Sequence, residues 1–312
     1  MILKIVPVFG QCGRNISSLH RPIENVTVVG GGLMGSGIAQ VAAQSGNNVT
    51  ILETDENQLE NAQKIISNSL ARVAKKFFKD DNQKSQAFVQ EISTKITGTT
   101  DLKRAVANAD LVIEAVVENL EVKHKLFKSL DEAAPARTIF ASNTSSLSIS
   151  ELATVIQRKE KFGGLHFFNP VPLMKLLEVV RTSETSVDTL ETFLNWGKSL
   201  GKTCVQCKDT PGFIVNRLLV PYLAEAVRMF ERGDASAEDI DIAMKLGAGH
   251  PMGPLELTDY TGLDLGVFIM EGWHKKYPHD PLFQPVEYQK KLVAEGKLGR
   301  KSGEGFYKYK QF

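Results

Sequence analysis

The sequence is poor in cysteine, carries almost no net charge and contains no long apolar run. Three cysteines among 312 residues cannot build a disulfide framework, which favours a reducing compartment. A formal net charge of only +1 disfavours nucleic-acid binding driven by phosphate neutralisation. No apolar run approaches the roughly 18 residues of a membrane-spanning helix. With 42% hydrophobic residues, the chain is typical of a globular protein with one large or two ordinary domains.

Two of the cysteines, Cys204 and Cys207, form a C-x-x-C pair, a pattern found in redox-active and metal-binding sites. No second pair and no cluster of histidines accompanies it at ligand spacing, so we predict no metal site. The surrounding segment, 203–207, alternates like a β-strand, and residues three apart on a strand face opposite sides. We therefore expect both thiols to be structural.

Residues 1–24 differ in composition from the rest of the chain. They hold Lys4, Arg14 and Arg21 but a single acid, Glu24, together with several serines and apolar residues. Few acids combined with arginine and serine are typical of a mitochondrial transit peptide. This pattern predicts a location in the mitochondrial matrix, and the alternative is a disordered tail.

A glycine-rich turn follows the first predicted strand. The apolar run 26–29 indicates a strand, 33–45 has helical spacing, and 49–52 indicates a second strand, so the unit implies parallel strands. The turn between strand and helix has the spacing G-x-G-x-x-G, which is weak alone but gains weight from this context. Gly30 would permit a tight turn, Gly32 a close approach of the backbone to a pyrophosphate, and Gly35 close packing of helix on strand. The whole motif is Gly30, Gly31, Gly32, Leu33, Met34 and Gly35.

An acid ends the second strand of this unit. Glu53 lies 23 residues after Gly30, where a carboxylate can accept hydrogen bonds from an adenosine ribose. It would repel a 2′-phosphate, and no arginine lies beside it. The sequence therefore predicts NAD rather than NADP as the cofactor.

The remaining pattern predicts two domains. Further strands are expected at 111–113, 138–141, 162–165 and 176–180, which indicates an α/β fold with a Rossmann-like doubly wound sheet over residues 25–210. Two amphipathic helices form a predicted helical hairpin insertion near 55–92. Strand signals fade at 209–212, and a mainly helical C-terminal domain for substrate binding and dimerisation is predicted over 211–312. Its helices are expected at 213–232, 237–246, 263–276 and 285–294.

A histidine and an acid mark the candidate catalytic centre. A strand runs to His166, and a proline-containing connection leads to a second strand that holds Glu178, so the two can face each other. An imidazole titrates at about pH 6.5, which suits proton removal from an alcohol, and a carboxylate partner would fix its tautomer. The alternative is a core histidine that bonds to backbone. His250 is a rival that looks more like a loop residue between helices.

Two polar residues are candidate substrate ligands. Ser145 lies in the run 142–146, just past the carboxyl end of a predicted parallel strand, where such sheets bind ligands. The alternative is a helix N-cap. Asn216 lies at the start of the helical domain, near the expected crevice between the domains.

These segments together resemble L-3-hydroxyacyl-CoA dehydrogenase, specifically its stand-alone mitochondrial type. The resemblance runs from about residue 25 to the end of the chain. It rests on the glycine-rich turn and four further motifs: Ser-Asn-Thr-Ser-Ser at 142–146, His-Phe-Phe-Asn-Pro at 166–170, Pro-Gly-Phe-Ile-Val-Asn-Arg at 211–217, and Gly-Arg-Lys-Ser-Gly-Glu-Gly-Phe-Tyr at 299–307. It implies an enzyme of fatty-acid β-oxidation that oxidises the 3-hydroxyl of an L-3-hydroxyacyl-CoA with NAD, as a homodimer.

The resemblance also implies roles for particular residues. His166 would be the general base with Glu178 as its partner, and Ser145 and Asn216 would line the substrate and nicotinamide site. Ser69 and Lys76 would contact coenzyme A, which agrees with their spacing of seven residues on one face of a predicted helix. Further NAD contacts would come from Glu118, Lys123, Asn169 and Lys301. Glu53 departs from the family pattern, which usually has aspartate there, so its contact with the ribose is less direct.

Three alternatives stay open on the sequence alone. A gulonate dehydrogenase resembling lambda-crystallin would use the same scaffold for a sugar acid and would need no coenzyme A contacts. A nucleotide-binding structural protein would need neither His166 nor Glu178. A segment of a multifunctional β-oxidation enzyme is the third.

Overall fold

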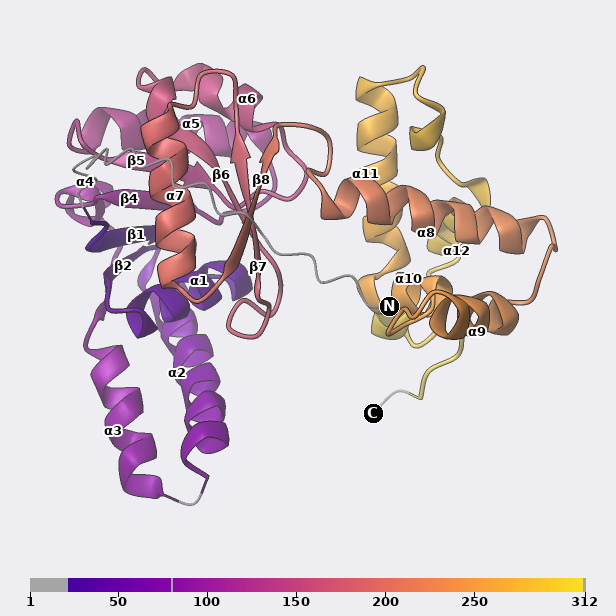
Figure 1. Ribbon diagram of the computed structural model, residues 1–312, viewed down its shortest axis with the longest axis horizontal. Coiled ribbons are helices and arrows are strands. Elements are labelled where there is room, and N and C mark those ends of the chain that lie inside the picture. Colours follow the sequence, from indigo (N-terminus) through magenta and orange to yellow (C-terminus); the bar gives the residue numbers. More distant parts are fainter. Residues whose placement is uncertain (1–21, 80, 311–312) are drawn as a thin grey trace, which may run out of the picture.

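The computed structural model describes residues 22–79 and 81–310. The predicted transit peptide therefore lies almost wholly outside the described residues. Figure 1 shows a sheet domain joined to a separate group of helices, with a helical hairpin extending from the sheet domain. This two-part arrangement determines where a site between the domains can form.

One eight-stranded sheet organises the first part of the chain, in the order β3-β2-β1-β4-β5-β6-β7-β8. Six strands are parallel, whereas β7 runs antiparallel to β6, and β8 is parallel to β7. The strand order reverses between β1 and β4, which is where doubly wound sheets bind nucleotides. The predicted fold class is confirmed. The strands are β1 (Asn25–Val29), β2 (Asn48–Leu52), β3 (Ile96–Thr99), β4 (Leu111–Glu114), β5 (Ile139–Ser142), β6 (Phe162–Phe167), β7 (Leu176–Arg181) and β8 (Thr203–Lys208).

Helices cover both faces of this sheet. One apolar core lies beneath α1 (Leu33–Gln44), α2 (Glu56–Phe78) and α7 (Val187–Ser199). A second core lies on the other face, beneath α4 (Leu102–Val106), α5 (Leu120–Ala133) and α6 (Ile149–Leu152). Buried on both faces, the parallel strands read as nearly continuous apolar runs.

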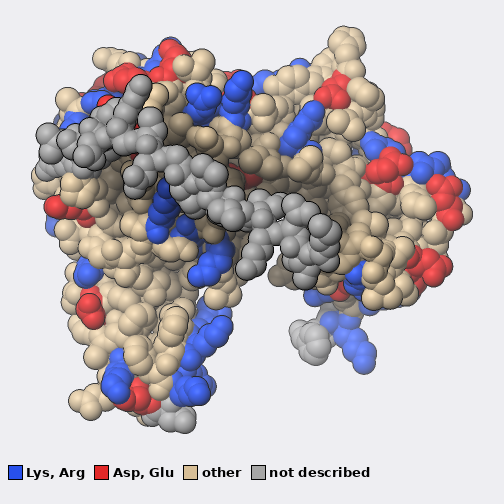
Figure 2. All heavy atoms as spheres, in the orientation of Figure 1, with Lys and Arg blue, Asp and Glu red and all other residues tan. Residues whose placement is uncertain are grey.

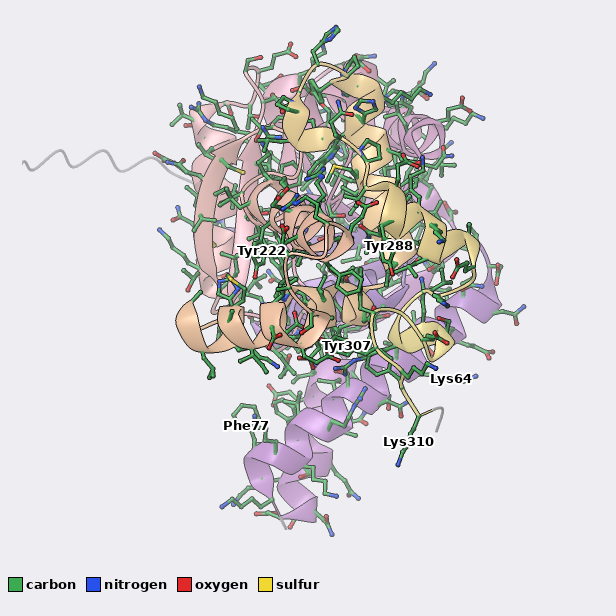
Figure 3. The ribbon with its side chains drawn as sticks, turned by 90° about the vertical axis from the view of Figure 1, so that its right-hand side faces the viewer. Lys64, Phe77, Tyr222, Tyr288, Tyr307 and Lys310 are labelled. Atoms are coloured by element: carbon green, nitrogen blue, oxygen red, sulfur yellow. The ribbon has the colours of Figure 1, made fainter. Side chains whose placement is uncertain are left out.

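The hairpin pairs α2 with α3 (Asn82–Ser93). Asp55 and Asp81 begin the two helices, since each carboxylate accepts a hydrogen bond from a backbone N–H in the first turn. The helices meet near the tip through Phe78 and Phe88, whose ring centroids lie 5.6 Å apart. Phe77, beside this pair, projects into solvent at the end of the hairpin (Figure 3).

The C-terminal part is helical and has its own core. Tyr288, labelled in Figure 3, and Phe306 pack against Phe230 with ring centroids 5.5 and 5.6 Å from it. The helices are α8 (Val215–Glu231), α9 (Ala237–Gly247), α10 (Pro254–Thr261), α11 (Leu263–Lys276) and α12 (Glu287–Ala294). The sequence pattern places the start of the first helix at 213, but Phe213 has a φ of +56° and forms part of a turn, so the predicted start is wrong by two residues.

Two buried carboxylates fasten the last residues of the chain to this domain. Asp259 accepts hydrogen bonds from the backbone N–H groups of Phe306 and Tyr307 and from the Tyr309 hydroxyl, each at 2.9 Å. Asp241 accepts one from the Tyr307 hydroxyl at 2.8 Å. Burial raises the pKa of Asp259 above its ordinary value. The segment that carries Lys301 is thus tied to α9 and α10.

Candidate active site

The glycine-rich turn is built as a phosphate cradle. Gly30 has a φ of +95°, and a Cβ there would lie 2.7 Å from the Ala115 carbonyl oxygen. A Cβ on Gly35 would lie 1.7 Å from the Gly30 carbonyl oxygen, so only glycine allows α1 to pack this close to β1. A Cβ on Gly32 would meet nothing within 4 Å, which leaves open space above the turn. These are the properties that a bound pyrophosphate requires.

The N-terminus of α1 is free for a ligand. Gly32 is its N-cap and supplies no side chain to satisfy the first N–H groups, so these and the helix dipole face the open space. Glu53 accepts a hydrogen bond from the Gly31 backbone N–H, which places its carboxylate at the rim of the turn. The residues present therefore fit a dinucleotide whose ribose reaches Glu53.

A cavity of about 470 Å³ opens at the carboxyl ends of β4, β5 and β6. Its walls come from both parts of the chain, because α11 contributes Leu265, Phe268 and Ile269 opposite the strand ends. We call it the catalytic cavity. It brings together seven predicted site residues: Met34, Glu118, Lys123, Ser145, His166, Asn169 and Asn216.

His166, which lines this cavity, forms a buried pair with Glu178, which does not. They stand directly opposite each other on antiparallel β6 and β7, and His166 Nδ1 lies 2.7 Å from Glu178 Oε2. Glu178 is fully buried, and its other oxygen, Oε1, accepts hydrogen bonds from the backbone N–H groups of Ile214 and Val215 at 3.1 and 2.9 Å. With Nδ1 donating to the carboxylate, Nε2 is the nitrogen left to accept a proton.

Aromatic rings and a half-buried amide hold the histidine in place. The imidazole centroid lies 4.5 Å from the Phe168 ring and 5.5 Å from the Phe213 ring. Asn143 Oδ1 accepts a hydrogen bond from the Phe167 backbone N–H at 2.9 Å, which fixes the end of β6. A side chain with a locked rotamer is what a general base needs.

A buried charge network lies at the floor of the cavity. The Lys123 ammonium is 2.6 Å from Glu114 Oε1 and 2.9 Å from Glu118 Oε2, and Lys123 is only 1% exposed. Glu114 also accepts hydrogen bonds from the Ser142 hydroxyl and the Val116 backbone N–H. Two carboxylates thus share one ammonium.

Glu118 is the more exposed carboxylate of this network. Burial acts to raise its pKa, but the Lys123 charge and the hydroxyls of Thr144 and Ser146 outweigh burial and hold the pKa below the ordinary value. Glu118 therefore stays ionised at the edge of the cavity.

Sequence reasoning did not identify Glu114. The signal that drew attention to Glu53, an acid at the carboxyl end of a buried strand, is also present at Glu114, which ends β4. Its role is to hold Lys123 where Lys123 reaches the cavity.

Ser145 and Asn216 link the two parts of the chain at the cavity. The Asn216 side-chain amide donates to the Ser145 carbonyl oxygen at 3.5 Å. Because Asn216 belongs to α8 and Ser145 follows β5, this contact spans the crevice between the domains.

Besides Glu53 and the glycine-rich turn, three further predicted ligands lie apart from the catalytic cavity. Ser69 and Lys76 lie on α2, where Ser69 is half-buried and Lys76 exposed. Figure 2 shows Lys and Arg side chains along the side of the hairpin that faces the helical domain. Lys301 pairs with Asp264 on α11, with Nζ 2.6 Å from Oδ2.

The other candidate groups show no catalytic arrangement. Burial raises the pKa of the Cys207 thiol to about 12, with Glu178 and Asp209 adding to the effect, and Cys204 is also a free thiol with a raised pKa. His250 Nδ1 lies 3.2 Å from the Tyr222 hydroxyl in the helical domain. Within residues 22–79 and 81–310, no group of three or more potential ligands is placed to hold a metal ion. No helix in the same ranges is long and apolar enough to cross a membrane.

A phosphate cradle at the switch point of a doubly wound sheet, next to a buried His–Glu pair, defines an NAD-dependent dehydrogenase. The model of the 3-hydroxyacyl-CoA dehydrogenase NAD-binding domain matches residues 25–210, and that of the family's C-terminal domain matches residues 212–309. The chain therefore belongs to the 3-hydroxyacyl-CoA dehydrogenase family.

Individual relatives agree with this assignment. The chain is 59% identical to mitochondrial hydroxyacyl-coenzyme A dehydrogenase from Sus scrofa, over 92% of each chain. It is 57% identical to a probable 3-hydroxyacyl-CoA dehydrogenase from Caenorhabditis elegans, over 92% of this chain and 93% of the relative. The solved (S)-3-hydroxybutyryl-CoA dehydrogenase from Ralstonia eutropha superposes with a TM-score of 0.87 at 40% identity, over 93% of this chain and 100% of that one. The predicted family, NAD cofactor and dehydrogenase activity on 3-hydroxyacyl-CoA are thus confirmed.

Proposed function

We propose that the chain oxidises L-3-hydroxyacyl-CoA to 3-ketoacyl-CoA with His166 as the general base. The observation that supports this most strongly is the buried His166–Glu178 pair, 2.7 Å apart, at a cavity reached by residues of both domains. His166 Nε2 takes the proton of the C3 hydroxyl, and the Glu178 carboxylate stabilises the imidazolium that forms. A positioned base of this kind contributes about 10²–10⁴-fold in rate.

NAD⁺, when bound, supplies the acceptor for the hydride that leaves C3. Gly30 to Gly35 would hold its pyrophosphate and Glu53 its adenosine ribose, which fits the open space over Gly32. The residues proposed to contact the rest of the cofactor are Glu118, Lys123, Ser145, Asn169 and Lys301. Four of these line the catalytic cavity, whereas Lys301 does not line it and is paired with Asp264.

Ser145 and Asn216 are proposed to bind the reacting end of the substrate. Both line the catalytic cavity from opposite sides of the crevice, so a substrate between them would contact both domains. Ser69 and Lys76 of α2 are proposed to bind the coenzyme A moiety. The positive charge along the hairpin supports this role, because coenzyme A carries phosphates (Figure 2).

The function is tested by following NADH absorbance with an L-3-hydroxyacyl-CoA and, in parallel, with L-gulonate. We expect rapid turnover of the thioester alone. Replacement His166→Gln should reduce kcat at least 10²-fold, by the general-base contribution of about 10²–10⁴, while leaving NADH binding unchanged. Turnover of gulonate alone would show that the chain is a gulonate dehydrogenase instead. Undiminished turnover in the His166→Gln variant would exclude His166 as the general base.

A homodimer is proposed to form through the helical domain. Several large apolar side chains are exposed there, which favours a protein interface: Leu218, Ile242, Leu246, Tyr260 and Phe268. Sedimentation velocity should give the mass of a dimer, and a purely monomeric species at micromolar concentration would contradict this proposal.

We also propose that the protein works in the mitochondrial matrix, in fatty-acid β-oxidation. The composition of residues 1–24 and the mitochondrial relatives support the proposal. Expression with a C-terminal fluorescent tag tests it, since cytosolic fluorescence would exclude this location.

A further inference from the structure

A second cavity of about 150 Å³ lies inside the helical domain, between α8, α10, α11 and the segment leading into α12. We call it the helical-domain cavity. Ser145, Asn216, Leu265 and Ile269 line both this cavity and the catalytic cavity. The two spaces are therefore neighbours that share one wall, at the point where the proposed substrate ligands lie.

The walls of the helical-domain cavity are largely apolar. They include Val220, Leu223 and Ala224 from α8, Met270 from α11, and Val286. Such a lining is suited to a hydrocarbon group.

Three polar side chains in the wall, those of Gln289, Thr258 and Lys290, already have partners within the protein. Gln289 Nε2 donates to the Leu263 carbonyl oxygen at 3.0 Å, and the Thr258 hydroxyl donates to the Pro254 carbonyl oxygen at 2.8 Å. Lys290 is paired with Glu271 and Glu287. A charged or strongly polar ligand would find few free groups here, whereas a hydrocarbon ligand needs none.

We infer that the helical-domain cavity receives the alkyl tail of the acyl group and sets the chain-length preference of the enzyme. The inference rests on the proposed function, which places the C3 hydroxyl at His166 between Ser145 and Asn216. At C3, the alkyl tail and the thioester arm diverge from one carbon. With coenzyme A directed towards the hairpin, the shared wall at Ser145, Asn216, Leu265 and Ile269 gives the tail a route into the helical domain.

The volume sets the length of tail that fits. An apolar cavity of about 150 Å³ in another protein holds one benzene molecule, which has six carbons. A tail of roughly six carbons beyond C3 therefore fills the cavity. Each methylene buried up to that length should raise kcat/KM about fourfold, the equivalent of ~0.8 kcal/mol. Longer tails should bring no further gain.

The test measures kcat/KM at saturating NAD⁺ for L-3-hydroxyacyl-CoA substrates of increasing chain length, from four carbons upwards. Val220→Phe narrows the cavity, so kcat/KM for the longer substrates should fall at least tenfold, because about two lost methylene contacts at about fourfold each suffice for this loss. The value for the four-carbon substrate should stay within about twofold. Leu223→Ala widens the cavity and should move the optimum to longer chains. Leu282→Ala is the matched control, because Leu282 is exposed in the same domain and lines neither cavity.

A binding series on the unaltered protein gives a readout independent of turnover and of the folding of any variant. Calorimetry with saturated acyl-CoA thioesters should show affinity that rises with chain length and then levels off. An affinity independent of chain length, or variants whose length profile matches the wild type, would overturn the inference. Failure of the wild type to oxidise any 3-hydroxyacyl-CoA would instead overturn the proposed function, so the two failures are distinguishable.

Discussion

The variant Glu178→Gln separates the chemical role of this carboxylate from its structural role. In the wild type, Oε1 accepts two backbone N–H groups and Oε2 accepts the His166 Nδ1 proton. The amide of glutamine has one acceptor oxygen and one donor nitrogen. The two backbone donors hold the oxygen on their side, so the NH₂ group must face His166.

That orientation reverses the tautomer of the imidazole. Nδ1, 2.7 Å from the new donor, has to accept a hydrogen bond, and the ring proton moves to Nε2, which can then no longer take the substrate proton. In a serine protease, the equivalent change of tautomer lowers kcat about 10⁴-fold. We therefore expect kcat to fall about 10³–10⁴-fold, which corresponds to ~4–5.5 kcal/mol of barrier.

The measurement is kcat from NADH absorbance, together with NADH affinity from fluorescence titration. Affinity should be unchanged, because the backbone contacts of Oε1 survive and Glu178 itself does not line the cavity. Glu121→Gln, a change at an exposed carboxylate on α5, is the matched control and should keep full activity. A loss of less than tenfold in Glu178→Gln would refute the reasoning that this carboxylate sets the tautomer.

Two further predictions concern the cofactor site. Glu53→Ala removes the acceptor for the Gly31 N–H and the proposed ribose contact. NAD affinity should therefore fall about 10–150-fold, the equivalent of the ~1.5–3 kcal/mol of a charged hydrogen bond, and the ratio of NAD to NADP affinity should shrink. Titration with both cofactors checks this, and an unchanged ratio would contradict it. In the folded protein the pKa of Glu118 lies below its ordinary value of 4.5. Ionised Glu118 therefore stabilises the folded state above pH 4.5, and this stabilisation is lost as the pH falls through the pKa of the folded state. Urea unfolding at neutral and acidic pH should show a smaller acid loss in Glu118→Gln than in the wild type, and equal losses would argue against this assignment.

Much of the fold was predictable because buried parallel strands leave a plain signal. The apolar runs at 26–29, 49–52 and 111–113 each fall within a strand of the structure. The edge strand β3 escaped prediction because Thr97, Gly98 and Thr99 give it neither an apolar run nor a clear alternation. The helix α10 also escaped, since it begins with proline after a segment that reads as a loop.

The pairing of His166 with Glu178 followed from two strands joined by a short connection. The burial of Lys123 could not be foreseen from composition, because a lysine in a polar helix is normally solvated. Only the fold brings Glu114 and Glu118 to either side of its ammonium. Similarly, the route between the two cavities depends on how α8 and α11 lie against the sheet domain.

The attachment of the C-terminal segment has a consequence for biosynthesis. Phe306, Tyr307 and Tyr309 supply the hydrogen-bond donors for Asp259, and all three are translated after the helices α8 to α12. The sheet domain has all of its strands by Lys208 and can fold while the ribosome is still at work. The buried carboxylate of Asp259 lacks these donors until the ribosome has passed all five helices, α8 to α12, whereas Asp241 already has the backbone N–H groups of Leu255 and Glu256. The half of the site that carries His166 is therefore ready before the half that carries Asn216.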